Sequence, residues 1–251
     1  MPLIVLTAAI TLFRRQGLPP PWDPVPGSPS LELPLTPMPL IIYGASSALG
    51  CFAIKLAKVS NVHPIIAIAG GSKAYVETLL DVSKGDRLVD YRGGVEKMKE
   101  DVRDALGGLV VRHAVDCISA KQTWVPLTQL VEPDGGVVSV VSGASKYDED
   151  EIPKGVRVVY TYVGTVHDGA YLEGMPCQPP DKEEVRGDME WAGNFVKWFG
   201  GAVKRGDMRG HPYEVIDGGL EGVEEGLRKL RGGENKGRKY VYRVVEGEGE
   251  D

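Results

Sequence analysis

A turn of small residues, Gly44-Ala45-Ser46-Ser47-Ala48-Leu49-Gly50, is the strongest chemical signal in the sequence. It follows the apolar run Leu40–Tyr43 and precedes apolar residues at helical spacing. Such a turn brings backbone N–H groups and the positive end of a helix to one spot, which suits a pyrophosphate. The pattern therefore predicts a dinucleotide site, the alternative being an ordinary tight turn between a strand and a helix. The residues predicted to meet the phosphates are Ser46, Ser47, Ala48 and Leu49.

The end of the next apolar run, Pro64–Ala69, bears on which dinucleotide is bound. An acidic residue there would hold the 2′-hydroxyl of NAD. The sequence instead continues as Gly70-Gly71-Ser72-Lys73, with no carboxylate before Glu77. The hydroxyl of Ser72 and the ammonium of Lys73 fit a 2′-phosphate, so NADP(H) is favoured. The alternative is that Lys73 is a solvated residue near the start of a helix.

No residue can be assigned a catalytic role from the sequence. The histidines, His63, His113, His167 and His211, are scattered, and neither HExxH nor Cys-x-x-Cys spacing occurs, so no metal site is predicted. The Gly-x-Ser-x-Gly elbow of hydrolases is also absent. Cys117 follows an apolar run, and we interpret it as a small core residue. Hydride transfer needs little acid–base help from protein, because the cofactor carries the chemistry.

The elements that must position these residues alternate between strands and helices. Apolar runs that predict strands lie at residues 40–43, 64–69, 87–91, 114–118, 136–141 and 156–163. Helical spacing lies between them, at residues 49–57, 75–80, 95–106 and 124–131. This alternation predicts an α/β fold, a doubly wound parallel Rossmann sheet with flanking helices.

Four segments are predicted along the chain. Residues 1–16 form a leading helix, and residues 17–39, with nine of the eighteen prolines, form a proline-rich insertion. Residues 40–245 form an NADP(H)-binding domain with a C-terminal extension, and residues 246–251 an acidic tail. The extension is predicted to hold helices at 184–199 and 220–230 and a strand at 239–245. The inward face of its first helix is predicted to carry Met189, Ala192, Phe195, Val196 and Phe199.

Composition excludes several classes of protein. The formal net charge of −6 argues against nucleic-acid binding, which requires a basic footprint. The apolar run Pro2–Phe13 is too short to span a bilayer, and Arg14-Arg15 follows it, the reverse of a signal peptide. The cysteines are far apart, so reduced thiols and a cytoplasmic location are expected.

Two enzyme families share the glycine-rich opening. Gly-Ala-Ser-Ser-x-Leu-Gly resembles the turn of the short-chain dehydrogenases, but their Tyr-x-x-x-Lys pair is absent. The chain as a whole resembles the medium-chain dehydrogenase/reductases, especially fungal quinone-oxidoreductase-like and trans-enoyl-reductase-like members, which are also similar to zinc-type alcohol dehydrogenases. The motifs that carry this resemblance, besides the phosphate turn, are residues 6–13, 53–58, 89–92, 115–118, 162–167 and 218–223.

The resemblance implies a set of cofactor contacts. Ser46, Ser47 and Ala48 would face the pyrophosphate, and Ser72, Lys73 and Tyr91 would surround the ribose phosphate of adenosine. The nicotinamide side would be closed by Ser142, Gly143, Val163 and Gly164, and the late contacts would be Asn235 and Lys239. The alternative for each late position is strand-end packing or a solvated surface.

The implied activity is NADPH-dependent reduction of a quinone, an enoyl group or a carbonyl on a small-molecule substrate. Relatives carry an N-terminal GroES-like catalytic domain, which we expect to be missing here. The alternative function is therefore a catalytically idle NADP(H)-binding protein or a degenerate remnant. Relatives also pair the sixth strand of the sheet between subunits, which implies a homodimer through Val156–Val163.

Overall fold

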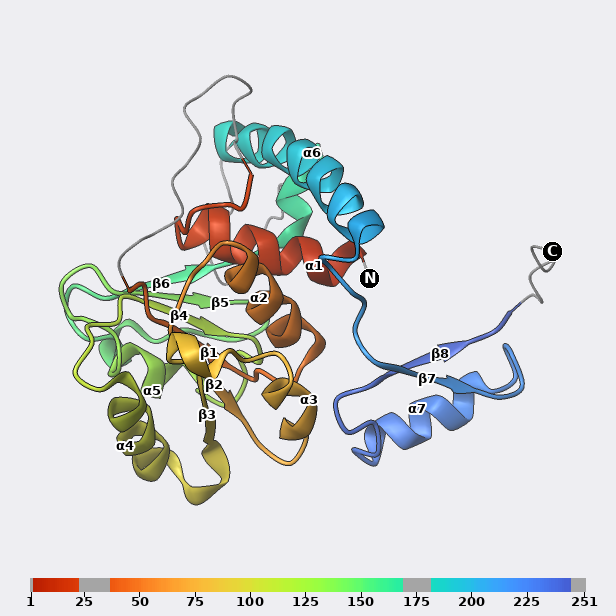
Figure 1. Ribbon diagram of the computed structural model, residues 1–251, viewed down its shortest axis with the longest axis horizontal. Helices are drawn as coiled ribbons and strands as arrows, with labels where there is room; N and C mark the ends of the chain where they lie inside the picture. Colours follow the sequence, from red (N-terminus) through yellow and green to blue (C-terminus); the bar gives the residue numbers. More distant parts are fainter. Residues whose placement is uncertain (1, 23–36, 169–181, 245–251) are drawn as a thin grey trace. The chain divides into compact units, whose positions relative to one another are not determined.

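The computed structural model describes residues 2–22, 37–168 and 182–244 of the chain (Figure 1). It divides into two compact units, Met1–Arg209 and Gly210–Asp251. The leading helix lies in the first unit, together with the sheet that carries the predicted phosphate turn. Among the described residues, no helix combines the length and the apolar character needed to cross a bilayer.

The first unit is built on six strands that are all parallel, in the order β3-β2-β1-β4-β5-β6. Their bounds are β1 Leu40–Tyr43, β2 Ile65–Ala69, β3 Arg87–Asp90, β4 His113–Asp116, β5 Val137–Val140 and β6 Arg157–Tyr160. The central strands are apolar on both faces, as a parallel sheet covered by helices requires. The predicted α/β class and doubly wound Rossmann sheet are confirmed, since this strand order is that of dinucleotide-binding folds.

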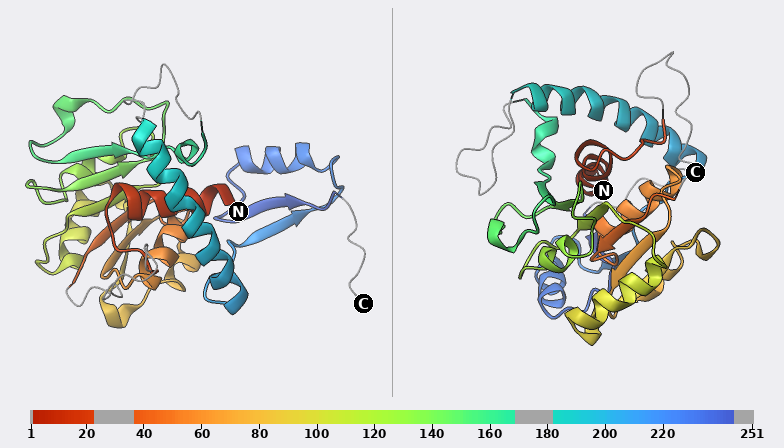
Figure 2. Two further views of the ribbon diagram at one scale, coloured as in Figure 1. Left: turned by 90° about the horizontal axis from the view of Figure 1, so that it is seen from above. Right: turned by 90° about the vertical axis from the view of Figure 1, so that its left-hand side faces the viewer.

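Helices cover both faces of the sheet (Figures 1 and 2). One face packs on α4 Val95–Leu106 and α5 Trp124–Thr128. The other packs on α2 Ala48–Val59 and on a leading helix, in which α1 Pro2–Ala9 continues as the π-helical turn η1 Ile10–Arg15. The short helix α3 Lys73–Glu77 follows β2. Successive side chains of β1 point to opposite faces of the sheet. Leu40 and Ile42 pack in the core beneath α1 and α2, and Ile41 packs in the core beneath α4 and α5.

The long helix α6 Lys182–Arg205 lies over the leading helix on the side away from the sheet (Figure 2). Aromatic rings from three segments hold it there. Phe195 stacks on Trp191 at 5.7 Å between ring centroids, and Trp22 packs against both rings. Phe13 of η1 meets Trp22 edge-on at 5.6 Å. The described start of the proline-rich segment is therefore anchored on α6 by Trp22.

The prediction for the inward face of this helix is partly wrong. Ala192 and Phe195 are buried and Phe199 packs against the core, as expected. Met189 and Val196, however, are exposed. The reason is that α6 buries a narrow stripe around Trp191, Phe195 and Trp198 on a single underlying helix, and side chains to either side of that stripe remain in solvent.

The second unit is a small strand–helix–strand element. Its strands, β7 Tyr213–Ile216 and β8 Lys239–Tyr242, are parallel and joined through α7 Val223–Arg231. The helix and the final strand were predicted, but β7 was not, because its four residues lie between polar and glycine-rich segments. The ring of Tyr242 packs against Gly226, where a side chain would not fit. This contact holds α7 on one face of the two-stranded sheet.

Replacing Phe195 tests the packing of α6. Phe195→Ala should lower the free energy of unfolding by roughly 3–5 kcal/mol, the usual cost of removing a buried phenyl group. Phe195 is 1% exposed and Val196 is 59% exposed, so Val196→Ala on the same helix is the matched control. The control should change stability by less than about 0.5 kcal/mol. All four tryptophans lie in the first unit, so urea unfolding followed by fluorescence reports on that unit. Equal effects of the two variants would contradict the packing described.

Candidate cofactor site

The carboxyl ends of all six strands meet at one edge of the sheet, because the strands are parallel. Strand order reverses between β1 and β4, which pair with Tyr43 opposite Asp116. In open α/β sheets, ligands bind in the crevice at such a reversal. Eleven of the thirteen predicted cofactor residues follow the carboxyl ends of β1, β2, β3, β5 and β6. The structure thus brings these residues to one edge, while their contact with a cofactor stays a prediction.

The phosphate turn joins β1 to α2 at the centre of this edge. Gly44 has a φ of +71°, a left-handed conformation that favours glycine. Ser47 is the N-cap of α2, and its Oγ accepts a hydrogen bond from the N–H of Gly50 at 3.0 Å. The preceding N–H groups of the first turn, those of Ala48 and Leu49, have no acceptor within the helix. They can therefore meet an anion at the positive end of α2.

Two glycines allow the helix and the turn to approach closely. A Cβ added to Gly50 would lie 2.5 Å from the carbonyl oxygen of Gly44 and 2.6 Å from the Cα of Ala45. A Cβ added to Gly44 would lie 2.6 Å from the side chain of Ile118, beyond β4. The side chain of Leu49 is buried in the core, so only its backbone can meet a cofactor. Ser46, Ser47 and Ala48 remain partly exposed at the crevice.

The residues after β2 and β3 form a second part of the site. The side chain of Tyr91 lies on Gly70, where an added Cβ would be 2.9 Å from two ring carbons and from the hydroxyl oxygen. Tyr91 is 5.8 Å from the ring of Tyr43, at the end of β1. Ser72 precedes α3 without a capping hydrogen bond, and Lys73 begins that helix. The predicted grouping of Ser72, Lys73 and Tyr91 therefore follows from two adjacent parallel strands.

Charge at this end of the site is positive on balance. The carboxylate of Asp90 accepts hydrogen bonds from Nε and Nη2 of Arg92, at 2.9 and 2.6 Å. The hydrogen bonds of Arg92 keep the pKa of Asp90 below its usual range, and Lys73 contributes in the same direction. Two cations, Lys73 and Arg92, thus stand beside one carboxylate. Sequence reasoning missed Arg92, although a basic residue directly after a strand-end tyrosine was a usable signal.

The loop after β4 is held by a buried carboxylate that sequence reasoning gave no role. Asp116 accepts hydrogen bonds from the N–H groups of Ile118 and Ser119, at 2.9 and 2.8 Å, and from the hydroxyl of Thr123, at 2.6 Å. Burial raises its pKa, and these hydrogen bonds partly offset that effect. Ser119 has a φ of +51°, and its Oγ accepts from the N–H of Val141. The ends of β4 and β5 are therefore tied together beside the phosphate turn.

The predicted residues after β5 lie next to this loop. The hydroxyl of Tyr147 donates to the carbonyl of Ser142 at 2.7 Å. The hydroxyls of Ser142 and Ser145 are 3.2 Å apart, and Ser145 also donates to the carbonyl of Ser119. Ser142 and Gly143 are both partly exposed. They form a polar rim on the β4–β6 half of the edge.

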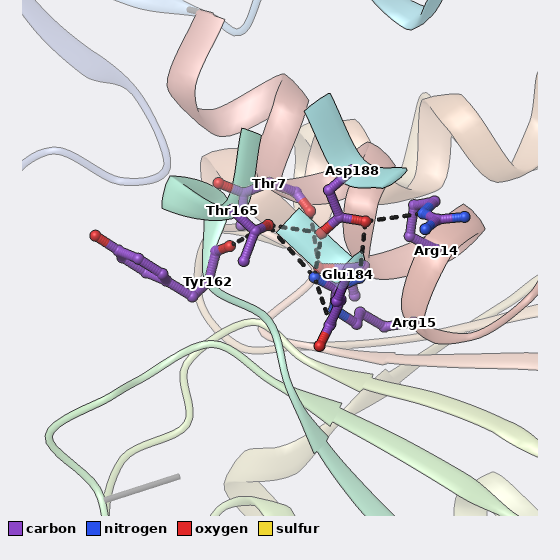
Figure 3. A network of polar contacts seen from close by, with 8 residues as sticks. Thr7, Arg14, Arg15, Tyr162, Thr165, Glu184 and Asp188 are labelled. Carbon is purple, nitrogen blue, oxygen red and sulfur yellow. Dashed lines mark hydrogen bonds and ion pairs between the residues drawn. The ribbon is translucent and has the colours of Figure 1, made fainter. Parts of the chain in front are cut away.

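The predicted residues after β6 lie in a short turn, η5 Val163–Val166, which a buried polar network holds (Figure 3). Asp188 of α6 is fully buried; its carboxylate accepts from Nε of Arg14 at 2.8 Å and pairs with Arg15 at 2.5 Å. The hydroxyl of Thr165 in η5 also donates to Asp188, at 2.7 Å. Burial tends to raise the pKa of Asp188, but Arg15, Arg14 and Thr165 together hold it below the usual range. No structural role was predicted for Arg14-Arg15.

The described cysteines do not form a reactive site. Burial raises the pKa of Cys51 to about 12, although Lys55 acts in the opposite direction. Burial also raises the pKa of Cys117 well above its ordinary value, as expected of a small core residue. Cys177 lies outside the described residues. Within the described ranges, no three His, Cys, Asp or Glu side chains gather in an arrangement that would hold a metal ion.

The two late predicted residues lie in the second unit. Asn235 is in the loop after α7, and its side-chain amide donates to the carbonyl of Arg238 at 3.3 Å. Lys239 begins β8, opposite Tyr213 of β7. These contacts are those of a loop and a strand end. A cofactor contact for either residue stays a prediction.

The strand order and the turn are those found in dinucleotide-binding α/β folds. Comparisons with known proteins add to this. No family model matches the sequence. A trans-enoyl reductase of Gibberella fujikuroi is 32% identical over 222 residues, which are 88% of this chain and 58% of that protein. A dual trans-enoyl reductase/FAD-dependent monooxygenase of Aspergillus terreus is 28% identical over 92% of this chain and 30% of its own length. The chain thus spans less than two thirds of these relatives.

Solved structures agree at the level of the fold. CurK enoyl reductase has a TM-score of 0.65 at 14% identity, over 95% of this chain and 59% of that chain. CurA of Vibrio vulnificus, solved in complex with NADPH, has a TM-score of 0.59 at 14% identity, over 96% of this chain and 62% of that chain. The predicted resemblance to enoyl-reductase-like members of the medium-chain dehydrogenase/reductases is confirmed.

Adding a methyl group to Gly50 tests the close approach in the phosphate turn. Gly50→Ala should destabilise the chain by roughly 1–3 kcal/mol, the usual cost of overpacking, because the backbone of Gly44 cannot move aside easily. Gly193 lies in α6 with nothing within 4 Å of its added Cβ. Gly193→Ala should therefore stabilise the chain by about 0.5–1 kcal/mol through helix propensity. Thermal unfolding of both variants decides; a neutral Gly50→Ala would refute the packing described.

Proposed function

We propose that the chain is an NADPH-dependent oxidoreductase of the medium-chain type, which reduces an activated double bond of the enoyl kind by hydride transfer. The observation that carries the proposal is the phosphate turn at the N-terminus of α2, placed where strand order reverses. The trans-enoyl reductase relative, similar over 88% of this chain, favours an enoyl group over a quinone or another carbonyl compound.

The residues present fit a dinucleotide. Gly44 and Gly50 allow the turn to pack tightly at the start of α2. A pyrophosphate there would accept from the N–H groups of Ala48 and Leu49 and from the hydroxyls of Ser46 and Ser47. Tyr43, Tyr91 and the exposed side chain of Ile118 offer apolar surface for the adenine ring. Binding of a pyrophosphate requires a tight turn of small residues whose backbone N–H groups are free to donate, and this turn has both properties.

The choice of NADPH over NADH rests on charge. The end of β2 carries no carboxylate for a ribose 2′-hydroxyl, and Ser72, Lys73 and Arg92 supply donors for a 2′-phosphate. Arg92 is engaged by Asp90 in this structure, and a phosphate would compete for its exposed guanidinium. The proposed pocket is therefore electrostatically suited to the 2′-phosphate of NADPH and poorly suited to the 2′-hydroxyl of NADH.

The β4–β6 half of the edge would receive the nicotinamide. When bound, NADPH supplies the hydride for reduction. The protein's part is to orient that half, through the loop held by Asp116, the rim at Ser142 and Gly143, and the turn at Val163 and Gly164. Among the described residues, none is identified as a proton donor in this half of the edge. A second function is therefore considered.

The second candidate is a catalytically idle NADP(H)-binding protein. Both candidate functions use the same cofactor site, and they differ only in whether bound NADPH is oxidised. One activity assay therefore separates them. Following NADPH absorbance with an enoyl thioester and with a small quinone should show oxidation that depends on the enoyl compound. Binding of NADPH without oxidation by any acceptor would favour the idle protein.

Replacing Lys73 tests the proposed cofactor preference. In calorimetric titrations of the full chain, Lys73→Ala should weaken NADPH binding about tenfold, the loss of one hydrogen bond to a charged group. The affinity for NADH should not change, because NADH has no 2′-phosphate. Lys84, near the amino end of β3, provides a control with the same change of charge, and Lys84→Ala should leave both affinities unchanged. Equal losses for NADPH and NADH would refute a phosphate contact.

We also propose that two copies of the chain pair through β6. This strand is at one end of the order of the described sheet, so one side of its backbone has no partner strand there. Sedimentation velocity should show a dimer that persists on dilution to micromolar concentration. A monomer at every concentration tested would refute the pairing.

A further inference from the structure

We infer that Arg15, Asp188 and Thr165 form a positioning cluster, which sets the turn Val163–Gly164 and thereby the fit of the nicotinamide half of the cofactor. The inference rests on the proposed function and adds residues to it that touch no reacting atom. Arg15 and Asp188 lie on helices, and Thr165 is the next residue after the predicted pair Val163 and Gly164 in η5. They act from the leading helix, from α6 and from within η5.

The geometry links the turn directly to the ion pair (Figure 3). The hydroxyl of Thr165 is 2.7 Å from Oδ2 of Asp188 and 3.0 Å from the carbonyl of Tyr162, the residue before the turn. Nη2 of Arg15 reaches the same carboxylate oxygen at 2.5 Å and the Thr165 hydroxyl at 3.4 Å. The one hydroxyl therefore joins the start of the turn to a buried ion pair.

The turn itself has little freedom once this contact is made. The N–H of Thr165 donates to the carbonyl of Tyr162, and the N–H of His167 donates to that of Gly164. The ring of Tyr162 lies on Gly164, where an added Cβ would be 2.3 Å away, and its side chain points away from the ion pair. Holding Thr165 therefore fixes the position of Gly164 at the edge of the sheet.

Fold stability alone does not call for this ion pair. The leading helix and α6 already share an apolar and aromatic contact, and Asp188 is fully buried. A buried ion pair is seldom more stabilising than apolar residues in its place, but its geometry is specific. Arg14 differs from Arg15 here, since among the described residues its ion pair is with Asp188 alone and its side chain is about one-third exposed. We therefore assign the positioning role to Arg15.

The test compares two ligands on the full chain by calorimetry. NADPH covers both halves of the proposed site, and adenosine 2′,5′-bisphosphate covers only the adenosine half. Thr165→Val removes the hydroxyl and keeps the shape of the side chain. It should weaken NADPH binding about fivefold, the value of one hydrogen bond, and leave adenosine 2′,5′-bisphosphate binding unchanged. Asp188→Asn and Arg15→Gln should show the same selective loss, and Arg14→Gln a smaller one.

A matched control is another buried carboxylate far from the turn. Asp86 is fully buried, pairs with His63 at 2.7 Å and accepts from the N–H of Ile65, near the amino end of β2. Asp86→Asn should destabilise the fold but cause no selective loss of NADPH affinity. If Thr165→Val weakens both ligands equally, or weakens neither, the positioning role is wrong.

The wild-type chain separates failure of this inference from failure of the proposed function. Wild type that binds neither ligand would overturn the proposed function and the inference with it. Wild type that binds both with equal affinity would keep the adenosine site but overturn the inference, because the nicotinamide half would then contribute nothing. Tighter binding of NADPH, lost selectively in Thr165→Val, is the result that supports it.

Discussion

A parallel sheet must bury both of its faces, and the rest of this structure depends on that constraint. Parallel strands need crossovers, and right-handed crossovers place helices on both faces. In the first unit, α1 and α2 cover one face and α4 and α5 the other, while α6 packs on the outer side of the leading helix. Every strand then ends at the same edge, so the loops that follow β1 to β6 lie along that edge. The site is thus a consequence of how the sheet is covered.

Different interactions hold the three parts of that edge. Close packing sets the phosphate turn at the centre, charged side chains lie at one end, and buried polar contacts hold the loops at the other end. In the phosphate turn, backbone atoms leave no room for a side chain at Gly50, and the side chain of Ile118 leaves none at Gly44. Beside β2 and β3, the two cations Lys73 and Arg92 outnumber the carboxylate of Asp90. On the other side, buried carboxylates hold the loops, Asp116 after β4 and Asp188 beneath the turn after β6. This division suits a ligand with a charged half and a half whose orientation matters.

The parts of the fold that the sequence predicts are those set by local pattern. The turn after Leu40–Tyr43 and the helix over 95–106 have short-range signals, and both lie where they were predicted. The exposed positions of Met189 and Val196 were not predictable, because the width of the buried stripe on α6 depends on a helix more than 170 residues away in sequence. Strand β7 was not predicted because Glu214 interrupts its four residues and only Ile216 is buried, so no apolar run marks it.

The candidate site was predictable wherever a residue follows a strand directly. Ser46, Ser72 and Ser142 are of this kind, because strand ends can be located from apolar runs. Arg14-Arg15 served in the sequence only as an argument against a signal peptide, and its structural role was not predicted. Its partner, Asp188, lies on another helix, and only tertiary structure brings the two together. Polar residues that pair across such a long stretch of sequence form no motif that a single sequence reveals.

The central claim is that a dinucleotide binds along the carboxyl edge of the sheet, and hydrogen exchange measured with and without NADPH tests it most directly. The account predicts protection of peptides covering residues 44–50, 70–73 and 142–143, and of the turn Val163–Val166. Residues 108–111 and 130–133 line a hollow of about 280 Å³ at the opposite edge and should show no change. Protection at the hollow, with none at the phosphate turn, would contradict the account.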